Sequence, residues 1–243
     1  MRALILSDIH SNLEALKAVI EDAESRGGFD IIWCLGDTVG YGPDPGPCLK
    51  LLRRHVLLAV AGNHDCAAVG KMGVEEFNYA AKAAALFTTK QLSDEESEFL
   101  SGLPLVVLAD PFTLVHGTLR DPLVEYLLDQ ETALATLEML TTRFCLVGHS
   151  HLSFLFRADQ SPAEFFEFVE DESYPLEGER WIINPGAVGQ PRDRDPRPSY
   201  AIYDSQGGTI ERHRVVYDIP ATQEKMRLAK LPHYLIQRLA HGI

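Results

Sequence analysis

The chain has 243 residues, of which 46% are hydrophobic, so it can bury the core of one large domain. Its formal net charge of −13 argues against a broad cationic surface that would bind a nucleic-acid polymer. It shows no signal-peptide pattern and no apolar run near the roughly 20 residues that span a bilayer, so we expect a cytoplasmic protein without a membrane partner.

Short apolar runs alternate with helical patterns from the N-terminus to about residue 151. The runs mostly lack polar alternation, which is typical of strands buried on both faces. They are residues 3–6, 31–35, 56–60, 112–115 and 144–147. The helical patterns are residues 12–23, 45–55, 75–91, 94–100, 122–128 and 131–140. Gly27 and Gly28 end the first helix, and Ser93 with Glu96 forms a capping box before the fourth.

After residue 151 the pattern changes to alternating strands, which indicates antiparallel pairing with one face in water. These strands are residues 152–157, 164–169, 181–183, 200–203 and 209–217. The sequence therefore predicts an α/β fold with two stacked mixed β-sheets flanked by helices, in four layers. We expect a single domain at 1–218 and a helical tail at 219–243 packed on it, with the oligomeric state open.

Polar motifs follow the strands of the first part of the chain. They are Asp8-Ile9-His10, Gly36-Asp37, Gly62-Asn63-His64-Asp65, His116-Gly117 and Gly148-His149-Ser150-His151. Side chains at i and i+2 share one face of an extended segment, and ligands of open α/β sheets bind beyond the carboxyl ends of the strands. We therefore expect these donors to converge. Such a set of oxygen and imidazole donors is large enough for two metal ions, a device for attacking phosphate esters.

In this order, the motifs resemble those of the calcineurin-like metallophosphoesterase superfamily. Three further stretches resemble the compact bacterial and archaeal phosphodiesterases of that superfamily. They are residues 7–12, the Gly40-Tyr41-Gly42-Pro43 segment, and residues 184–192. Ala187 departs from the pattern, because many relatives have Ser there, but it touches no ligand position.

The resemblance implies a ligand set for two divalent ions. Asp8, His10 and His151 would hold the first ion, and Asn63, His116 and His149 would hold the second. Asp37 would bridge both, and a carboxylate suits that place because its charge offsets two cations. Mixed nitrogen and oxygen donors do not choose between Mn, Fe, Ni, Co and Zn. A hydroxide shared by the two ions would attack phosphorus in line.

Four more residues are candidates for the chemistry. By resemblance, His64 would face the substrate, hydrogen-bonded to Asp65, and either protonate the leaving oxygen or stabilise the charge of the transition state. Asn12 and Arg192 are weaker candidates for contacts with the substrate phosphate. The remaining histidines, His55, His213, His233 and His241, are expected at the surface or at helix ends. The charged run 192–197 is expected to be a solvated loop.

Three functions fit these residues. The first is a metal-dependent phosphodiesterase acting on a small phosphorylated substrate. The alternative is a phosphomonoesterase, such as a protein serine/threonine phosphatase, or a diadenosine polyphosphate hydrolase. The third is a non-catalytic metal-binding scaffold, as in the retromer-coat subunit that keeps this fold, but such scaffolds tend to lose ligands that are all present here. Loops near 66–92 and 160–179 would set the choice of substrate.

Overall fold

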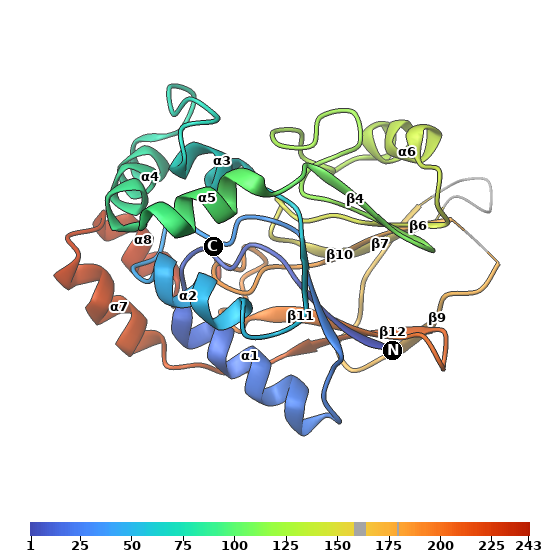
Figure 1. Ribbon diagram of the computed structural model, residues 1–243. Helices are drawn as coiled ribbons and strands as arrows, with labels where there is room; N and C mark the ends of the chain where they lie inside the picture. The colour runs from blue at the N-terminus through green and yellow to red at the C-terminus, as the bar shows by residue number, and fades with distance from the viewer. Residues whose placement is uncertain (158–163, 179) are drawn as a thin grey trace.

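The computed structural model describes residues 1–157, 164–178 and 180–243, and two mixed six-stranded sheets organise it (Figure 1). In sheet order, the first sheet contains β3 (Leu57–Ala59), β2 (Ile31–Cys34), β1 (Arg2–Leu6), β11 (Ser199–Asp204), β12 (Thr209–Arg214) and β9 (Ser173–Pro175). The second contains β4 (Val106–Ala109), β5 (Phe112–Val115), β6 (Phe144–Leu146), β10 (Trp181–Pro185), β7 (Ser153–Arg157) and β8 (Glu164–Phe166). β1 runs parallel to β2 and antiparallel to β11, so both pairing modes occur within one sheet.

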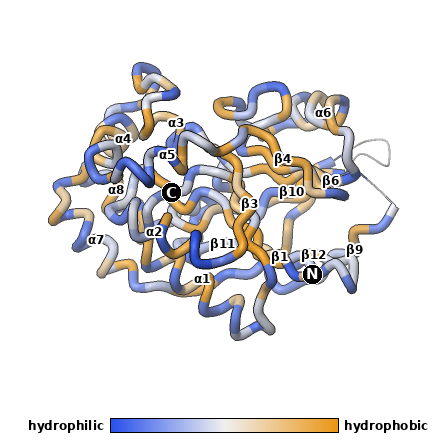
Figure 2. Tube along the Cα trace, in the orientation of Figure 1, coloured by the Kyte–Doolittle hydropathy of each residue, from blue (hydrophilic) through white to orange (hydrophobic). Residues whose placement is uncertain are grey.

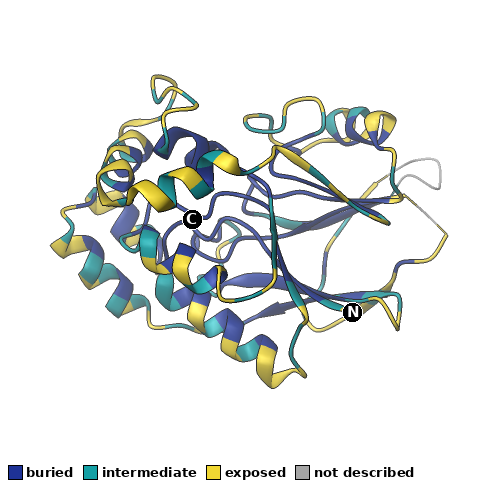
Figure 3. Cartoon of the chain, viewed as in Figure 1, coloured by how far each residue is buried: buried dark blue, intermediate teal, exposed yellow. Residues whose placement is uncertain are grey.

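The main core lies between the two sheets. Alternate residues of each central strand point into it, because side chains of a strand alternate between its faces. Ile5 and Trp33 from the first sheet pack in one cluster with Leu146 and Ile183 from the second. Figure 2 shows hydrophobic residues concentrated along the central strands, and Figure 3 shows that most of these strands are buried. The predicted stack of two mixed sheets is confirmed.

Helices lie on the outer faces of the sheets and beyond one end of them. They are α1 (Leu13–Ser25), α2 (Pro45–Leu52), α3 (Asn63–Ala68), α4 (Tyr79–Gln91), α5 (Asp94–Gly102), α6 (Gln130–Met139), α7 (Ile219–Leu228) and α8 (His233–Arg238). α1 and α2 pack on the first sheet and α6 packs on the second. The capping box predicted at Ser93 and Glu96 is present at the start of α5. The remaining helices gather beyond one end of the sheets (Figure 1).

The expectation of one solvated face for the later strands is wrong for β10 and β11. All residues of β10 are buried, as are the first five of β11. The reason is that a second layer covers each outer face. Ile182 of β10 packs in one cluster with residues of α6, and Tyr200 of β11 packs in one with residues of α1. The strand alternation therefore separates two different cores rather than core from water.

The predicted helix at 122–128 is also absent, and this segment is an irregular loop. Its backbone groups are used elsewhere, because Gly117 N donates to Pro122 O at 2.8 Å and Val124 O accepts from His149 Nε2 at 3.1 Å. A helix would need the same carbonyls for its own hydrogen bonds.

The short strands β4 and β9 and the short helix α3 were not predicted.

The C-terminal tail forms the two helices α7 and α8, as the sequence predicts. Met226, Leu235 and Leu239 are buried in a cluster with Tyr41 and residues of α4. Leu228 of α7, by contrast, is 75% exposed. The tail therefore packs on the rest of this chain. A domain boundary at residue 218 stays a prediction.

Three smaller expectations can be compared with the structure. His213 is buried rather than at the surface, and its Nδ1 lies 2.7 Å from Asp171 Oδ1. Of the loop 160–179 predicted to select the substrate, residues 160–163 and 179 lie outside the described residues. Within the described part of the chain, no helix combines the length and the hydropathy needed to cross a bilayer.

Candidate metal centre

The predicted motifs meet at one place, where the strands β1, β2, β5 and β6 end. The chain turns sharply there, and many of the ligand candidates have a positive φ, which L-residues seldom adopt. Asp8 (53°), His10 (48°), Asp37 (52°), His149 (63°) and His151 (60°) share this conformation. Strained backbone of this kind clusters at functional sites because the surrounding fold must hold it in place.

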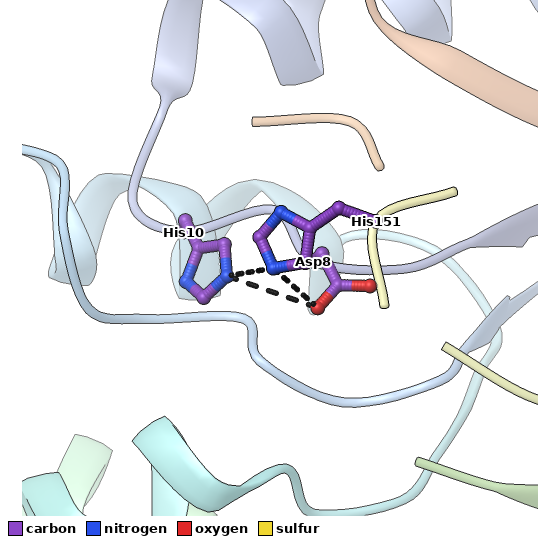
Figure 4. Close-up of side chains that lie close together, drawn as sticks. All are labelled: Asp8, His10 and His151. Atoms are coloured by element: carbon purple, nitrogen blue, oxygen red, sulfur yellow. Dashed lines mark hydrogen bonds and ion pairs between the residues drawn. The ribbon is translucent and has the colours of Figure 1, made fainter. Parts of the chain in front are cut away.

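The first group of donors consists of Asp8, His10 and His151, all buried (Figure 4). His10 Nε2 lies 3.1 Å from His151 Nε2, and Asp8 Oδ1 lies 3.7 Å from the former and 3.2 Å from the latter. Asp8 Oδ1 has no hydrogen-bond partner, although it is buried. A buried carboxylate oxygen that faces two imidazole nitrogens in this way needs a cation or a proton to offset its desolvation.

The second group consists of Asp37, His116 and His149, and it also is buried. His116 Nε2 lies 3.4 Å from Asp37 Oδ2, 3.1 Å from His149 Nδ1 and 3.2 Å from Asn63 Oδ1. The amide oxygen of Asn63 therefore lies with this group.

Asp37 lies between the two groups. Its Oδ2 is 3.6 Å from His10 Nε2 of the first group and 3.4 Å from His116 Nε2 of the second. Its Oδ1 accepts a hydrogen bond of 2.8 Å from the backbone N–H of His64. One carboxylate oxygen is thus directed at both sets of imidazoles, which is the position that a bridging ligand requires.

Backbone carbonyls orient all four imidazoles. His10 Nδ1 pairs with Val39 O at 3.1 Å and His116 Nδ1 with Leu35 O at 2.8 Å. In the same way, His149 Nε2 pairs with Val124 O at 3.1 Å and His151 Nδ1 with Gln190 O at 2.5 Å. A carbonyl accepts only from N–H, so in the neutral, metal-binding form of each ring the other nitrogen presents a lone pair to the centre. This arrangement is typical of histidine ligands to metals.

The electrostatics of the centre follow from burial and from crowded carboxylates. Burial, helped by Asp37, raises the pKa of Asp8 to about 6 against the opposing effect of His116. Burial lowers the pKa of His149 to about 3. Burial alone would also lower the pKa of His116, but Asp37 and Asp8 outweigh it and raise that pKa to about 9. Without cations, the desolvation of these buried groups therefore opposes their charged forms. Divalent ions would offset the carboxylate charges, and they fit this set of donors.

His64 lies beside the centre, but its predicted bond with Asp65 is absent. The ring of His64 packs between Tyr41 and Phe77, with centroid distances of 4.3 and 4.8 Å, and its Nδ1 has no hydrogen-bond partner. Asp65 instead accepts from Val39 N and Gly62 N, each at 3.0 Å. The two residues are neighbours on α3, so their side chains point about 100° apart around the helix. Asp65 therefore positions backbone and does not orient His64.

Burial also determines the charge of His64. It lowers the pKa of His64 to about 4, against the attraction of Asp37, and His116 and Arg192 lower it further. Asp65 does not bond to the ring, so it does not offset the effect of burial on this pKa. The imidazole of His64 is thus neutral at pH 7 in the free protein.

The two weaker candidates lie in different places. Asn12 is buried beneath the centre, where it caps α1 by accepting from Ala15 N at 3.2 Å and donates to Gly189 O at 3.0 Å. Its polar atoms serve the scaffold, and its position gives no support to a substrate contact. Arg192 lines a pocket of about 210 Å³ together with His64, His149 and His151.

Arg192 differs from Arg197 of the same loop and from Arg214 of β12. Arg197 pairs with Glu170 and Asp195, and Arg214 pairs with Asp193, so the run 192–197 is an ion-pair network rather than a freely solvated loop. Among the described residues, Arg192 forms no ion pair with a carboxylate, and its buried Nε has no partner. It is therefore a cation beside the centre with unused donors.

Two residues of the site carried no predicted role. Asn184, at the end of β10, donates to Gly148 O at 2.9 Å and to Ser150 Oγ at 3.0 Å, and so holds the turn that carries His149. Its place in the segment 184–192 indicated a motif residue but not its role, because its hydrogen-bond partners are distant in sequence. Tyr126 stacks on His149, with centroids 4.0 Å apart and planes 13° apart. No local pattern marks it, because the contact depends on the irregular loop 117–128.

Comparisons with known proteins agree with this geometry. Residues 1–208 match the family model of the calcineurin-like phosphoesterase superfamily domain. The uncharacterized protein MJ0912 of Methanocaldococcus jannaschii is 38% identical over 244 residues, which cover 98% of this chain and 97% of that protein. A metallophosphoesterase from Sphaerobacter thermophilus has a crystal structure with 43% identity and a TM-score of 0.91, covering 100% of this chain and 99% of that one.

A shorter match concerns a relative with a named activity. A symmetrical bis(5'-nucleosyl)-tetraphosphatase of Pseudomonas putida is 33% identical over 67 residues, or 27% of this chain and 23% of that protein. This match is too short to carry the activity across, whereas the family model and the two longer matches span most or all of the chain. The chain therefore belongs to the calcineurin-like phosphoesterase superfamily.

Proposed function

We propose that the protein is a metal-dependent phosphodiesterase that binds two divalent ions and hydrolyses a small phosphodiester. The observation that supports this most is the position of Asp37 Oδ2, which faces His10 of one donor group and His116 of the other. In the proposed scheme, Asp8, His10 and His151 hold one ion, while Asn63, His116 and His149 hold the other. Asp37 is the ligand that both ions share.

Each residue near the pocket then has a task. The two ions, when bound, supply Lewis acidity and a hydroxide nucleophile near neutral pH. His64 donates a hydrogen bond as a neutral imidazole to a phosphate oxygen that gains charge in the transition state. Arg192 offers a fixed guanidinium to the same phosphate group. Tyr41 and Phe77 enclose the ring of His64 and exclude water from it.

The charge of the pocket favours a diester over more highly charged substrates. Apart from the proposed ligands and His64, the charged residues that line it are Arg192 and Glu76, whose charges offset each other. A diester carries one negative charge on the scissile phosphate, whereas a monoester carries up to two. The two ions, when bound, would supply most of the positive charge, and a wall that adds no further net charge suits the former.

A second candidate is a dinucleoside polyphosphate hydrolase. Its support is the 67-residue similarity to the Pseudomonas putida tetraphosphatase. A polyphosphate would bring several negative charges to a pocket lined by one arginine, so we place this function second. Hydrolysis of diadenosine tetraphosphate at a higher kcat/KM than any simple diester would reverse the order.

The first experiment combines metal content with a choice between esters. We expect about two transition-metal ions per chain by elemental analysis of protein purified without chelator. With Mn²⁺ added, the protein should hydrolyse bis(4-nitrophenyl) phosphate faster than 4-nitrophenyl phosphate. Faster turnover of the monoester would promote the phosphatase, and protein with neither metal nor turnover would act as a scaffold.

Asp37→Asn tests the shared ligand. This substitution keeps the shape of the side chain but removes the charge that offsets two cations. We expect the metal content to fall and the turnover of bis(4-nitrophenyl) phosphate to drop by at least about 100-fold, the upper range for groups that only support a ligand. Glu76→Gln, a charge change on the pocket wall, is the control and should keep both ions. Wild-type metal content in Asp37→Asn would contradict the scheme.

A further inference from the structure

The pocket beside the metal centre has two chemically different sides. One side carries the polar groups of the centre, His64 and Arg192. The other side comes from two separate loops and from the start of α4. It is mostly apolar, with Met72, Phe77, Ala81, Val124 and Tyr126, although Glu76 and Asn78 of the same segment also line the pocket. A phosphate group can occupy the polar side, which leaves the apolar side for the organic part of a substrate.

Tyr126 is held in place on this apolar side. One face of its ring lies on His149 in a parallel stack, and the side chain remains 43% exposed. The loop that carries it is braced on the N-terminal side of Tyr126, because Glu125 pairs with Arg120 and accepts from Thr118 Oγ1 at 2.5 Å. Val124 O is bonded to His149 Nε2 at 3.1 Å. The ring is therefore oriented before any ligand binds.

The exposed part of a ring held in this way is available for a ligand to stack on. Keeping a large apolar ring partly in water forgoes part of the free energy that its burial would supply. Tyr41 and Phe77, the other aromatic residues of the pocket, use their rings against His64. Tyr126 also contacts a residue of the centre, His149, but it is more exposed than Tyr41 and Phe77.

We propose that Tyr126 is a specificity-determining residue that stacks on a planar aromatic ring in the substrate, on the arm of the diester next to the reacting phosphate. This inference rests on the proposed phosphodiesterase function and adds to it the chemical class of the substrate, an aryl or heteroaryl phosphodiester. The ring enters beside Phe77 and Met72, so that its edges meet apolar atoms. Stacking on a protein ring tolerates many ring types, since each presents a π face.

The test uses two diesters with the same leaving group. They are 4-nitrophenyl phenyl phosphate and 4-nitrophenyl methyl phosphate, so the retained arm alone differs. We expect the wild-type kcat/KM for the phenyl ester to exceed that for the methyl ester by roughly tenfold, a typical worth of one stacked ring. Tyr126→Leu should bring this ratio close to one, and Tyr126→Phe should preserve it.

The ratio is the informative quantity, because Tyr126→Leu can also disturb His149 and lower both rates together. Tyr234→Leu is the matched control, since this half-exposed tyrosine of α8 is absent from the pocket wall and should leave the ratio unchanged. A wild-type enzyme without preference for the phenyl arm, or an undiminished ratio in Tyr126→Leu, would overturn the proposal.

A binding measurement separates this proposal from the proposed function. Phenylphosphonate and methylphosphonate differ by the ring, and they carry the same charge at an alkaline pH at which both are dianions. By calorimetry on metal-loaded protein, phenylphosphonate should bind roughly tenfold more tightly to the wild type and to Tyr126→Phe, but not to Tyr126→Leu. If the protein hydrolyses neither diester, the phosphodiesterase function fails, and the phosphonates still decide the role of Tyr126. Equal affinities for the two phosphonates would refute it.

Discussion

The neutral imidazole of His64 changes the role that its motif suggests. A general acid must carry a proton that it can release, but burial lowers the pKa of His64 to about 4, so the protonated form is scarce at pH 7. A neutral ring can still donate one hydrogen bond. This lowered pKa is the reason that we propose charge stabilisation rather than proton delivery, the two roles that the sequence left open.

Two substitutions at His64 distinguish these roles. His64→Ala removes the donor, and we expect turnover to fall by roughly 10²–10³-fold, as for the loss of one transition-state hydrogen bond. His64→Gln keeps an N–H donor without a titratable proton, so it should recover part of this loss. Both variants should keep the metal content of the wild type. Equal losses in Gln and Ala would favour proton delivery, and loss of metal would make His64 a ligand.

At the scale of elements, the turn before α3 is in close contact with the turn after β2. A Cβ added to Gly62 would lie 2.1 Å from Asp37 Oδ1 and 2.3 Å from Asp37 N, so no side chain fits. Asp65 ties the same two segments together through Gly62 N and Val39 N. The position of the shared ligand Asp37 therefore depends on the close approach of these two turns.

Gly62→Ala tests this dependence. The added methyl group must displace Asp37, and a shift near 1 Å in a catalytic group can cost about 100-fold in rate. We expect turnover to fall by about that factor together with reduced metal content. Gly102→Ala is the matched control, because its Cβ would meet nothing within 4 Å. Equal activity in the two variants would show that the turns can separate without harm to the site.

At the scale of the whole molecule, the tail supports the wall of the site. Leu235 is buried in a cluster with Tyr41, and Tyr41 packs on His64. Lys225 of α7 adds ion pairs to Glu14 at 2.6 Å and Asp44 at 2.7 Å, but partly exposed pairs contribute little. The apolar contacts thus account for most of the attachment of the tail.

Leu235→Ala should lower the free energy of unfolding by about 2–5 kcal/mol, as for other buried leucines whose removal leaves a cavity. Leu228→Ala provides the control, since this residue is 75% exposed and should change stability by less than about 0.5 kcal/mol. Urea denaturation of both variants gives the comparison. Equal stability of the two would mean that the cluster around Tyr41 closes without Leu235.

The sequence by itself predicted the two stacked sheets and named the groups that the structure brings together at one sheet end. It could do so because strand and helix periodicity, and donors placed directly after strands, are local features. The tertiary structure decided the partners of Asp65, the neutral state of His64 and the stack of Tyr126 on His149. These depend on burial and on contacts between segments distant along the chain, which no local pattern encodes.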